Sequence, residues 1–268
     1  SMSGRQNELR KSRRNEGKIQ MKKCLIAIDG IDGSGKETQT KLLLSSLESD
    51  GIPHKYLSFP TYREPWSDLV TLYLGGGFGD SPENVNAYAA STFFACDRYC
   101  SYTLEKLETA LTGYKTGYHG EIERAIGDWK KEYDAGSVIV CNRYTTGNAV
   151  HQLSKLPENE WDAFLEWLED YEYGRLGLPK PDFVIYLCLP PETALEHIRK
   201  RSEETGREMD IHEKSAAHLE KSHRAALFAA EKLFWHTVNC SDDNGGMRTR
   251  SDIHNEITAL LEKGGFLK

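Results

Sequence analysis

A short glycine-rich segment, GIDGSGK at residues 30–36, restricts the fold more than any other feature of the sequence. It follows an apolar run, KKCLIAID at 22–29, and precedes a helical pattern in which Leu42, Leu43 and Leu47 share one face. The apolar run lacks polar alternation, which is typical of a parallel strand buried on both faces. Strand, glycine loop and helix together match G-x-x-x-x-G-K in the context that this pattern requires. The sequence therefore predicts an anion-binding turn in an α/β fold.

The residue types of this loop suit a nucleoside triphosphate. Glycines let several backbone N–H groups turn toward one phosphate, and the helix N-terminus adds partial positive charge. Lys36 is expected to reach the β- and γ-phosphates. The predicted ATP-binding residues are Gly30, Asp32, Gly33, Ser34, Gly35, Lys36, Glu37 and Thr38. Because Glu37 replaces the usual hydroxyl residue, we expect Mg²⁺ to be held through water, with Asp29 or Asp32 as the carboxylate.

Three further buried strands are predicted at 55–59, 137–141 and 183–189, with long helical patterns between them. This alternation predicts one domain at 22–268, with a central parallel sheet flanked by helices. The preceding residues, 1–21, are basic and lack apolar periodicity. They are expected to form a disordered tail or tag remnant, with a targeting segment as the alternative.

Composition and motifs argue against several classes of protein. The net charge of -7 is spread along the chain, which disfavours binding to a nucleic acid polymer. Six cysteines without metal-site or disulfide spacing indicate reduced thiols in a cytoplasmic protein. The longest apolar run is too short to cross a bilayer. The sequence has no guanine-reading N-K-x-D segment, and the strand end VIVCNR at 138–143 lacks the acid expected of a motor ATPase.

Three more segments resemble the thymidylate kinase family of P-loop nucleoside monophosphate kinases, and they occur in the order of that family. They are SFPTY at 58–62, FFACDR at 93–98 and NRYTTGNA at 142–149. With the glycine loop and PDFVIYL at 181–187, the resemblance extends over about residues 22–261. It implies a homodimer that phosphorylates dTMP to dTDP with ATP and Mg²⁺, a step in dTTP synthesis.

The predicted pyrimidine-binding residues begin with Phe94 and Arg98, which lie four apart and share a helix face. Phe94 can stack on a base, and Arg98 can donate to O4 of thymine but not to the amino group of cytosine. We therefore expect dUMP to be a poor substrate and dCMP to be nearly inert. A core aromatic and a surface ion pair are the alternatives. The resemblance adds Arg143 for the acceptor phosphate and Asn148 for the other edge of the base. It places His151 where relatives carry an aromatic ring that excludes a ribose 2′-hydroxyl.

The remaining predicted acceptor-site residues are Asp32, Phe59, Pro60 and Arg63. The last of these is expected to substitute for an arginine that some relatives carry at the position of Thr61. All of them lie in the glycine loop or just after a predicted strand. Ligands bind outside the carboxyl ends of strands in open α/β sheets, so this placement favours one common site.

A basic, glycine-broken segment at about 199–213 is predicted to be a lid. Its Arg201 and Arg207 would neutralise charge on the transferred phosphoryl group. A solvated loop between helices is the alternative. The predicted catalytic residues are Lys36, Arg143, Arg201 and Arg207. The resemblance adds Glu213, an acid at the far end of the lid and a third candidate metal ligand.

A stretch at about 102–131 is longer than the family requires, and it is predicted to be a helical insertion of unassigned role. Three departures from the family pattern, Glu37, Asn142 and His151, leave two alternatives open. One is a kinase for another deoxynucleotide or for a deoxynucleoside. The other is a nucleotide-binding regulator without turnover.

Overall fold

The structure is a computed structural model of the whole chain, and the residues described are 23–62, 64–104, 128–242 and 245–267. Three predictions fall outside them. They are the basic tail at 1–21, Arg63, and the greater part of the insertion at 102–131. None of the six cysteines, all of which lie within the described residues, forms a disulfide bond. Among the described residues, no helix has the length and apolar character needed to span a bilayer.

Five parallel strands form one sheet in the order β2-β3-β1-β4-β5. They are β1 (Cys24–Asp29), β2 (His54–Ser58), β3 (Val138–Asn142), β4 (Phe183–Cys188) and β5 (His236–Asn239). The first four confirm the predicted strands. β5 was not predicted, because its short sequence HTVN buries only Val238 at the edge of the sheet. The α/β class and the central parallel sheet are confirmed.

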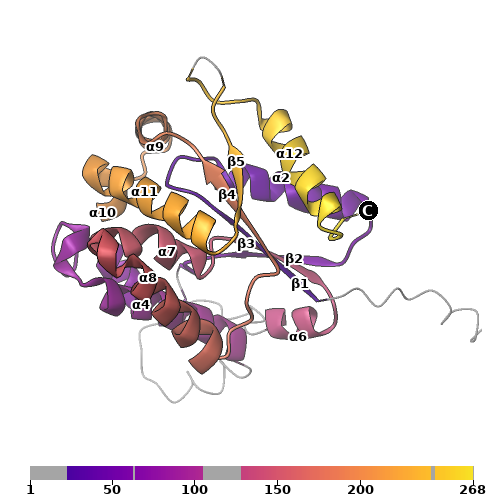
Figure 1. Cartoon of the computed structure of the whole chain (residues 1–268), viewed down its shortest axis with the longest axis horizontal. Helices are drawn as coiled ribbons and strands as arrows, with labels where there is room; N and C mark the ends of the chain where they lie inside the picture. The colour runs from indigo at the N-terminus through magenta and orange to yellow at the C-terminus, as the bar shows by residue number, and fades with distance from the viewer. Residues whose placement is uncertain (1–22, 63, 105–127, 243–244, 268) are drawn as a thin grey trace, which may run out of the picture.

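Helices cover both faces of this sheet. The α-helices are α2 (Lys36–Ser49), α3 (Asp68–Leu74), α4 (Ala87–Thr103), α6 (Asp128–Asp134), α7 (Thr146–His151), α8 (Trp161–Glu169), α9 (Pro191–Thr205), α10 (Ile211–Lys214), α11 (Ala216–Lys232) and α12 (Arg250–Lys263). The short 3₁₀ turns are η1 (Pro65–Ser67), η2 (Pro82–Asn84), η3 (Leu153–Lys155) and η4 (Glu158–Glu160), and a π-helical turn is η5 (Asp170–Arg175). Figure 1 shows α2 beside α12 on one side of the sheet, and α4, α7, α8 and α11 grouped on the other.

Successive side chains of β1 pack alternately into two hydrophobic clusters, one on each face of the sheet. Ile26 and Ile28 pack with Leu43 of α2 and Ile257 of α12 in one cluster. Leu25 and its alternate neighbours on β1 pack in a second cluster on the opposite face. All six residues of β1 are buried, as expected for a central strand covered on both faces. This burial fixes the end of β1, and with it the start of the glycine loop.

The segment predicted as a lid, 199–213, is not one loop. Its first part, through Thr205, is the end of α9, which stops at Gly206 in a left-handed conformation. α10 then begins after Asp210, which caps that helix. Arg201 therefore projects from a helix, whereas Arg207 lies in the short connection. The glycine that suggested a break marks a helix C-terminus, where positive φ favours glycine.

Candidate active site

The glycine loop joins β1 to α2 as the motif predicts. Gly33 and Gly35 have positive φ values of 82° and 89°. A Cβ on Gly33 would lie 2.3 Å from the carbonyl oxygen of Ala194 in α9, so the loop and α9 leave room for glycine alone. Ser34 Oγ is buried and has no hydrogen-bond partner in the described part of the chain. On one side the turn packs tightly against α9, and at the start of α2 it offers backbone N–H donors.

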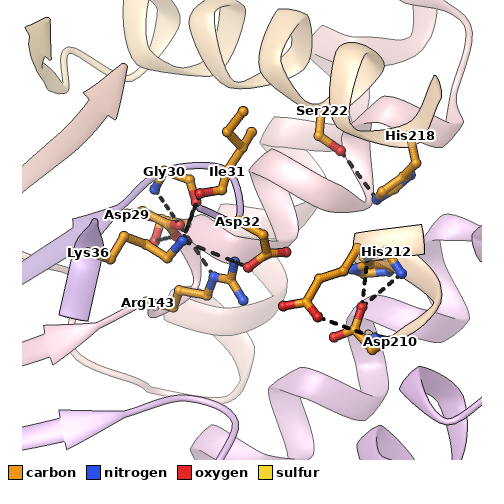
Figure 2. A network of polar contacts seen from close by, with 12 residues as sticks. Asp29, Gly30, Ile31, Asp32, Lys36, Arg143, Asp210, His212, His218 and Ser222 are labelled. Atoms are coloured by element: carbon orange, nitrogen blue, oxygen red, sulfur yellow. Dashed lines mark hydrogen bonds and ion pairs between the residues drawn. The ribbon is translucent and has the colours of Figure 1, made fainter. Parts of the chain in front are cut away.

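Four charged residues meet at the carboxyl edge of the sheet (Figure 2). Arg143, which follows β3 with a φ of 63°, donates from Nη2 to Asp32 Oδ1 at 2.6 Å. Its Nε lies 3.7 Å from Asp29 Oδ1, and Lys36 Nζ lies 3.9 Å from Asp32 Oδ1. Burial by itself would raise the pKa of Asp32, but the charges of Arg143 and Lys36 hold that pKa well below its usual range. The cluster therefore carries two cations and two carboxylates.

Lys36 is buried and turned back onto its own loop. Its Nζ donates to two carbonyl oxygens of residues 30 and 31, each at 2.9 Å. Burial and the neighbouring Arg143 lower the pKa of Lys36 to about 8. A depressed lysine pKa means that the charged form dominates below about pH 8 and is lost above it.

This pKa predicts that ATP binding weakens as pH rises from 7.5 to 9. Triphosphate binding favours the protonated lysine, so the association constant should fall by as much as about tenfold per pH unit above the pKa. Calorimetric titration with ATP at a series of pH values measures this association constant. A Lys36→Arg variant is the control, since a guanidinium stays charged throughout and its curve should be flat. A flat curve for the unmodified chain would contradict the prediction.

The three candidate metal ligands already have other partners. Asp29 is fully buried and accepts from the N–H of Gly30 at 2.8 Å and from Thr146 Oγ1 at 2.5 Å. Asp32 is paired with Arg143. Glu213 is buried and forms an ion pair with Arg201. These carboxylates fit an ion held through water better than one bound directly, because Mg²⁺ commonly keeps several waters.

Glu37, at the position where the motif usually has a hydroxyl residue, points to solvent. It accepts a hydrogen bond from Lys41 one turn later, at 2.6 Å, and both side chains are exposed. An exposed pair of this kind contributes little to stability. Thr38, the next residue with a hydroxyl, is partly buried on α2. Neither residue is brought to the charged cluster by an observed contact.

A pocket beside the charged cluster contains many of the predicted acceptor residues. Its lining residues are Pro60, Leu74, Phe94, Arg143, Tyr144, Gly147, Asn148, His151, Gln152, Asp210 and His212. They come from the loop after β2, from α3 and α4, from the turn after β3 with α7, and from the end of the lid segment. The predicted grouping of Pro60, Phe94, Arg143, Asn148 and His151 at one place is therefore present.

Phe59 does not line this pocket. Its side chain is 4% exposed and packs in the core edge-on to Tyr144, with ring centroids 5.8 Å apart. Asp97 of α4 fixes the next residues, since it accepts from both the N–H and the hydroxyl of Thr61. Phe59 is thus a core aromatic that positions the loop, and Pro60 is the residue that reaches the pocket.

Arg98 is also absent from the pocket lining. It is 1% exposed and makes a two-pronged ion pair with Glu172 of η5, from Nε at 2.7 Å and from Nη2 at 2.5 Å. Its Nη1 donates to the carbonyl oxygen of Tyr144 at 3.2 Å. The alternative of a surface ion pair is wrong as well, because the partner is a buried glutamate. Asn148 Nδ2 donates to the same Glu172 at 2.9 Å. Asn148 lines the pocket and Arg98 does not, so Arg98 lies on the side of Asn148 that faces away from the pocket.

Within the lid segment, Glu213 holds both predicted catalytic arginines. It is 2% exposed, forms an ion pair with Arg201 and lies 3.8 Å from Nη2 of Arg207. Its other oxygen accepts from the N–H of Asp210, which completes a reciprocal cap at the start of α10. The acid at the far end of the lid thus organises the lid cations, and no metal is needed to explain its burial.

Glu172, Asp210 and His212 are among the residues of this region that were not predicted. Glu172 lies in a π-helical turn, a feature often found at functional sites. Asp210 and His212 were within the predicted lid, but nothing in their spacing indicated that they would line the pocket. Burial and the negative charges of Asp32 and Glu213 raise the pKa of Asp210 to about 7. Each of these residues is brought to the site by tertiary packing alone.

Comparison with known proteins agrees with this architecture. The family model described as thymidylate kinase matches residues 28–116 and 120–246. A thymidylate kinase of Mycobacterium tuberculosis is 31% identical over 194 residues, which are 72% of this chain and 78% of that protein. A thymidylate kinase of Plasmodium falciparum is 25% identical over 240 residues, which are 89% of each chain.

A solved structure shows the same fold. The thymidylate kinase of Candida albicans superimposes with a TM-score of 0.58 over 91% of this chain and 93% of that chain, at 19% sequence identity. The family match covers the end of β1, the glycine loop, the pocket helices and the lid segment described above. The chain therefore belongs to the thymidylate kinase family, the phosphotransferases that convert dTMP to dTDP.

Proposed function

We propose that the glycine loop binds ATP, that the adjacent pocket binds dTMP, and that the residues between them carry out the phosphoryl transfer. Lys36 and the loop amides would hold the triphosphate, replacing the carbonyl contacts that Lys36 now makes. Arg143 lines the pocket and also contacts Asp32 of the loop, which supports a role for it in aligning the acceptor phosphate. Positioning and charge stabilisation account for most of the catalysis in such reactions.

The acceptor needs no general base. An attacking phosphate oxygen is already ionised at neutral pH, so the protein has only to orient it and to reduce repulsion. Arg201 and Arg207, gathered by Glu213, would supply positive charge to the transferred group. Mg²⁺ bound with ATP would neutralise part of the charge on the β- and γ-phosphates. We propose that Asp29 and Asp32 hold that ion through water.

The proposal that the base is thymine rests on the orientation of the Asn148 side-chain amide. Asn148 Nδ2 donates to the carbonyl oxygen of Ser91 at 3.2 Å and to Glu172 at 2.9 Å. Because both acceptors lie on the Nδ2 side, the amide cannot be reversed without losing both bonds. The carbonyl oxygen of Asn148 is then the atom left for the pocket. It can accept from N3–H of thymine or uracil, whereas N3 of cytosine has no hydrogen to donate.

Phe94 lines the same pocket and is free to stack on the base. Arg98 would contribute indirectly, by neutralising the buried Glu172 that orients Asn148. This changes the expected source of base selectivity from Arg98 to Asn148. The order of acceptors is unchanged, with dTMP above dUMP and dCMP last.

The test follows ADP release from the full chain with ATP and Mg²⁺, comparing dTMP, ribose TMP, dUMP, dCMP and AMP. We expect dUMP to lose about 10–200-fold in kcat/KM for the missing methyl group, and dCMP about 10⁴-fold for the mismatched hydrogen bond. A Lys36→Ala variant controls for contaminating kinases. Preference for another acceptor would overturn the base assignment. Binding of ATP and dTMP without turnover would favour the nucleotide-binding regulator.

We also infer a cytoplasmic homodimer, from the family resemblance and from six cysteines that form no disulfide bond in the described part of the chain. The chain mass is 30.4 kDa, so light scattering after size exclusion should give about twice that value. A mass equal to one chain at micromolar concentration would contradict the dimer.

A further inference from the structure

Three buried histidines from three different helices meet at one wall of the acceptor pocket. His151 ends α7, His212 lies in α10 and His218 lies in α11, and they are 4%, 4% and 1% exposed. Ring centroids are 4.9 Å apart for His151 and His212, and 4.5 Å apart for His212 and His218. One ring nitrogen from each lies within 4.8 Å of the other two. We call this group the histidine cluster.

Two serines connect His218 to the backbone of His151 through hydrogen bonds. Ser154 Oγ donates to the carbonyl oxygen of His151 at 2.8 Å, and Ser222 Oγ donates to Ser154 Oγ at 3.4 Å. Nε2 of His218 lies 3.2 Å from Ser222 Oγ (Figure 2), and in the tautomer with hydrogen on Nε2 this nitrogen donates to the serine oxygen. The Nδ1 atom of His218 then carries a lone pair. That atom is buried and has no partner among the described residues.

His151 and His212 also have ring nitrogens that are available to bind a ligand. Both ring nitrogens of His151 are buried and unpartnered within the described part of the chain. His212 Nε2 lies 2.9 Å from the hydroxyl of Tyr73, which accepts from Lys155 at 2.7 Å and can accept from His212 as well. Buried polar atoms are rarely left unpaired, and several together indicate a missing ligand. Metal-bound histidines commonly have their second nitrogen anchored in this way.

The cluster has the right charge state to bind a cation. Burial lowers the pKa of all three imidazoles, that of His218 to about 4, so each is neutral at physiological pH. Lys155, the cation bonded to Tyr73, has its own pKa lowered by burial to about 7. Neutral imidazoles suit zinc, copper or nickel rather than magnesium, and three of them with one water form a common zinc geometry.

We propose that the histidine cluster is a binding site for a divalent transition-metal ion of the zinc class, distinct from the magnesium that accompanies ATP. Tetrahedral ligands at about 2.0–2.1 Å from zinc lie about 3.4 Å from one another, and the ring nitrogens of the cluster lie within 4.8 Å of one another, so the separations must shorten by at most about 1.4 Å. The rings of His151 and His212 are stacked at 22°, so closure requires them to turn.

Bound metal would join α10, at the end of the lid segment, to α7 and α11. Because His151 and His212 line the acceptor pocket, metal and dTMP would influence each other, a consequence that rests on the proposed function.

Cobalt provides a direct test that does not depend on kinase activity. The untagged full chain, freed of metal with a chelator and without nucleotide, is titrated with Co²⁺ while the visible absorption of tetrahedral cobalt is recorded, and Zn²⁺ is then added as competitor. We expect one equivalent to bind. His218→Gln should weaken binding at least about 100-fold, and Ser222→Ala, which keeps all three histidines but removes the anchor of His218, about 10–100-fold. His223→Gln, on the same helix but outside the cluster, is the matched control.

Absence of the tetrahedral spectrum, or equal loss in the His218 and His223 variants, would overturn the site. If His218→Gln fails to fold, the Ser222→Ala result decides, because that variant keeps all three histidines. A second readout tests the coupling to the pocket: equimolar Zn²⁺ should shift the KM for dTMP in the unmodified chain more than in Ser222→Ala. A metal-binding signal with no measurable kinase activity would uphold the site and refute the proposed function separately.

Discussion

Replacing Arg143 by asparagine should lower kcat/KM for dTMP phosphorylation by about 10²–10³-fold, the usual loss for one preorganised donor to a developing charge. The guanidinium bridges Asp32 of the glycine loop and the acceptor pocket, so its removal affects the alignment of both phosphates. Asparagine is the informative substitution because position 143 has a φ of 63°, a region that asparagine tolerates better than alanine does. Steady-state kinetics with varied dTMP and ATP measure the change.

The matched control is Arg175→Asn. Arg175 is an exposed arginine in η5, paired with Asp170 on the surface, and its loss should leave kcat/KM unchanged. Asp32, now without its partner, will destabilise the Arg143→Asn protein, so the folded fraction must be measured by circular dichroism beside each rate. A loss below about threefold in folded enzyme would show that Arg143 serves the fold and not the transfer.

Replacing Glu172 by glutamine should reduce the selectivity for dTMP over dCMP by about 10²-fold or more. The glutamate accepts from Asn148 and from Arg98 and is fully buried. Oε1 of Glu172 accepts from both Nη2 of Arg98 and Nδ2 of Asn148, and a neutral glutamine amide cannot serve these donors as the carboxylate does. Asn148 is then held mainly by its bond to the carbonyl oxygen of Ser91. At the loss of that weaker bond, its amide can reverse and offer its own NH₂ to the pocket, matching N3 of cytosine. The same change leaves Arg98 buried without an anion, which should cost about 3–5 kcal/mol of folding free energy.

The ratio of kcat/KM for the two acceptors is the decisive measurement, because it does not depend on the folded fraction. Glu169→Gln is the matched control, since Glu169 precedes η5 by one residue and pairs with Lys180 near the surface. Urea denaturation of both variants separates the stability effect. A lower stability with an unchanged acceptor ratio would show that Glu172 supports the fold without setting the base preference.

Local sequence determined the catalytic loop and the strands that carry it. β1 is predicted by an apolar run and confirmed at 24–29, because a central strand needs apolar residues on both faces. Gly33 and Gly35 have the positive φ that the motif requires. These features depend on residues close in the chain, so a pattern can show them. The segment order of the family and the position of Phe94 in the pocket were accessible for the same reason.

Tertiary structure decided how the pocket side chains are paired. Arg98 was expected to face the base, but Glu172, 74 residues away, binds it behind Asn148. The histidine cluster joins residues from three helices whose spacing in the sequence has no metal-site pattern. Sequence by itself therefore determined four strands of the sheet, the glycine loop and the class of reaction, since these depend on local backbone and periodicity. Only the packing of distant helices decided which polar side chains face the pocket, because a buried charge or amide takes whichever partner the fold brings within hydrogen-bonding distance.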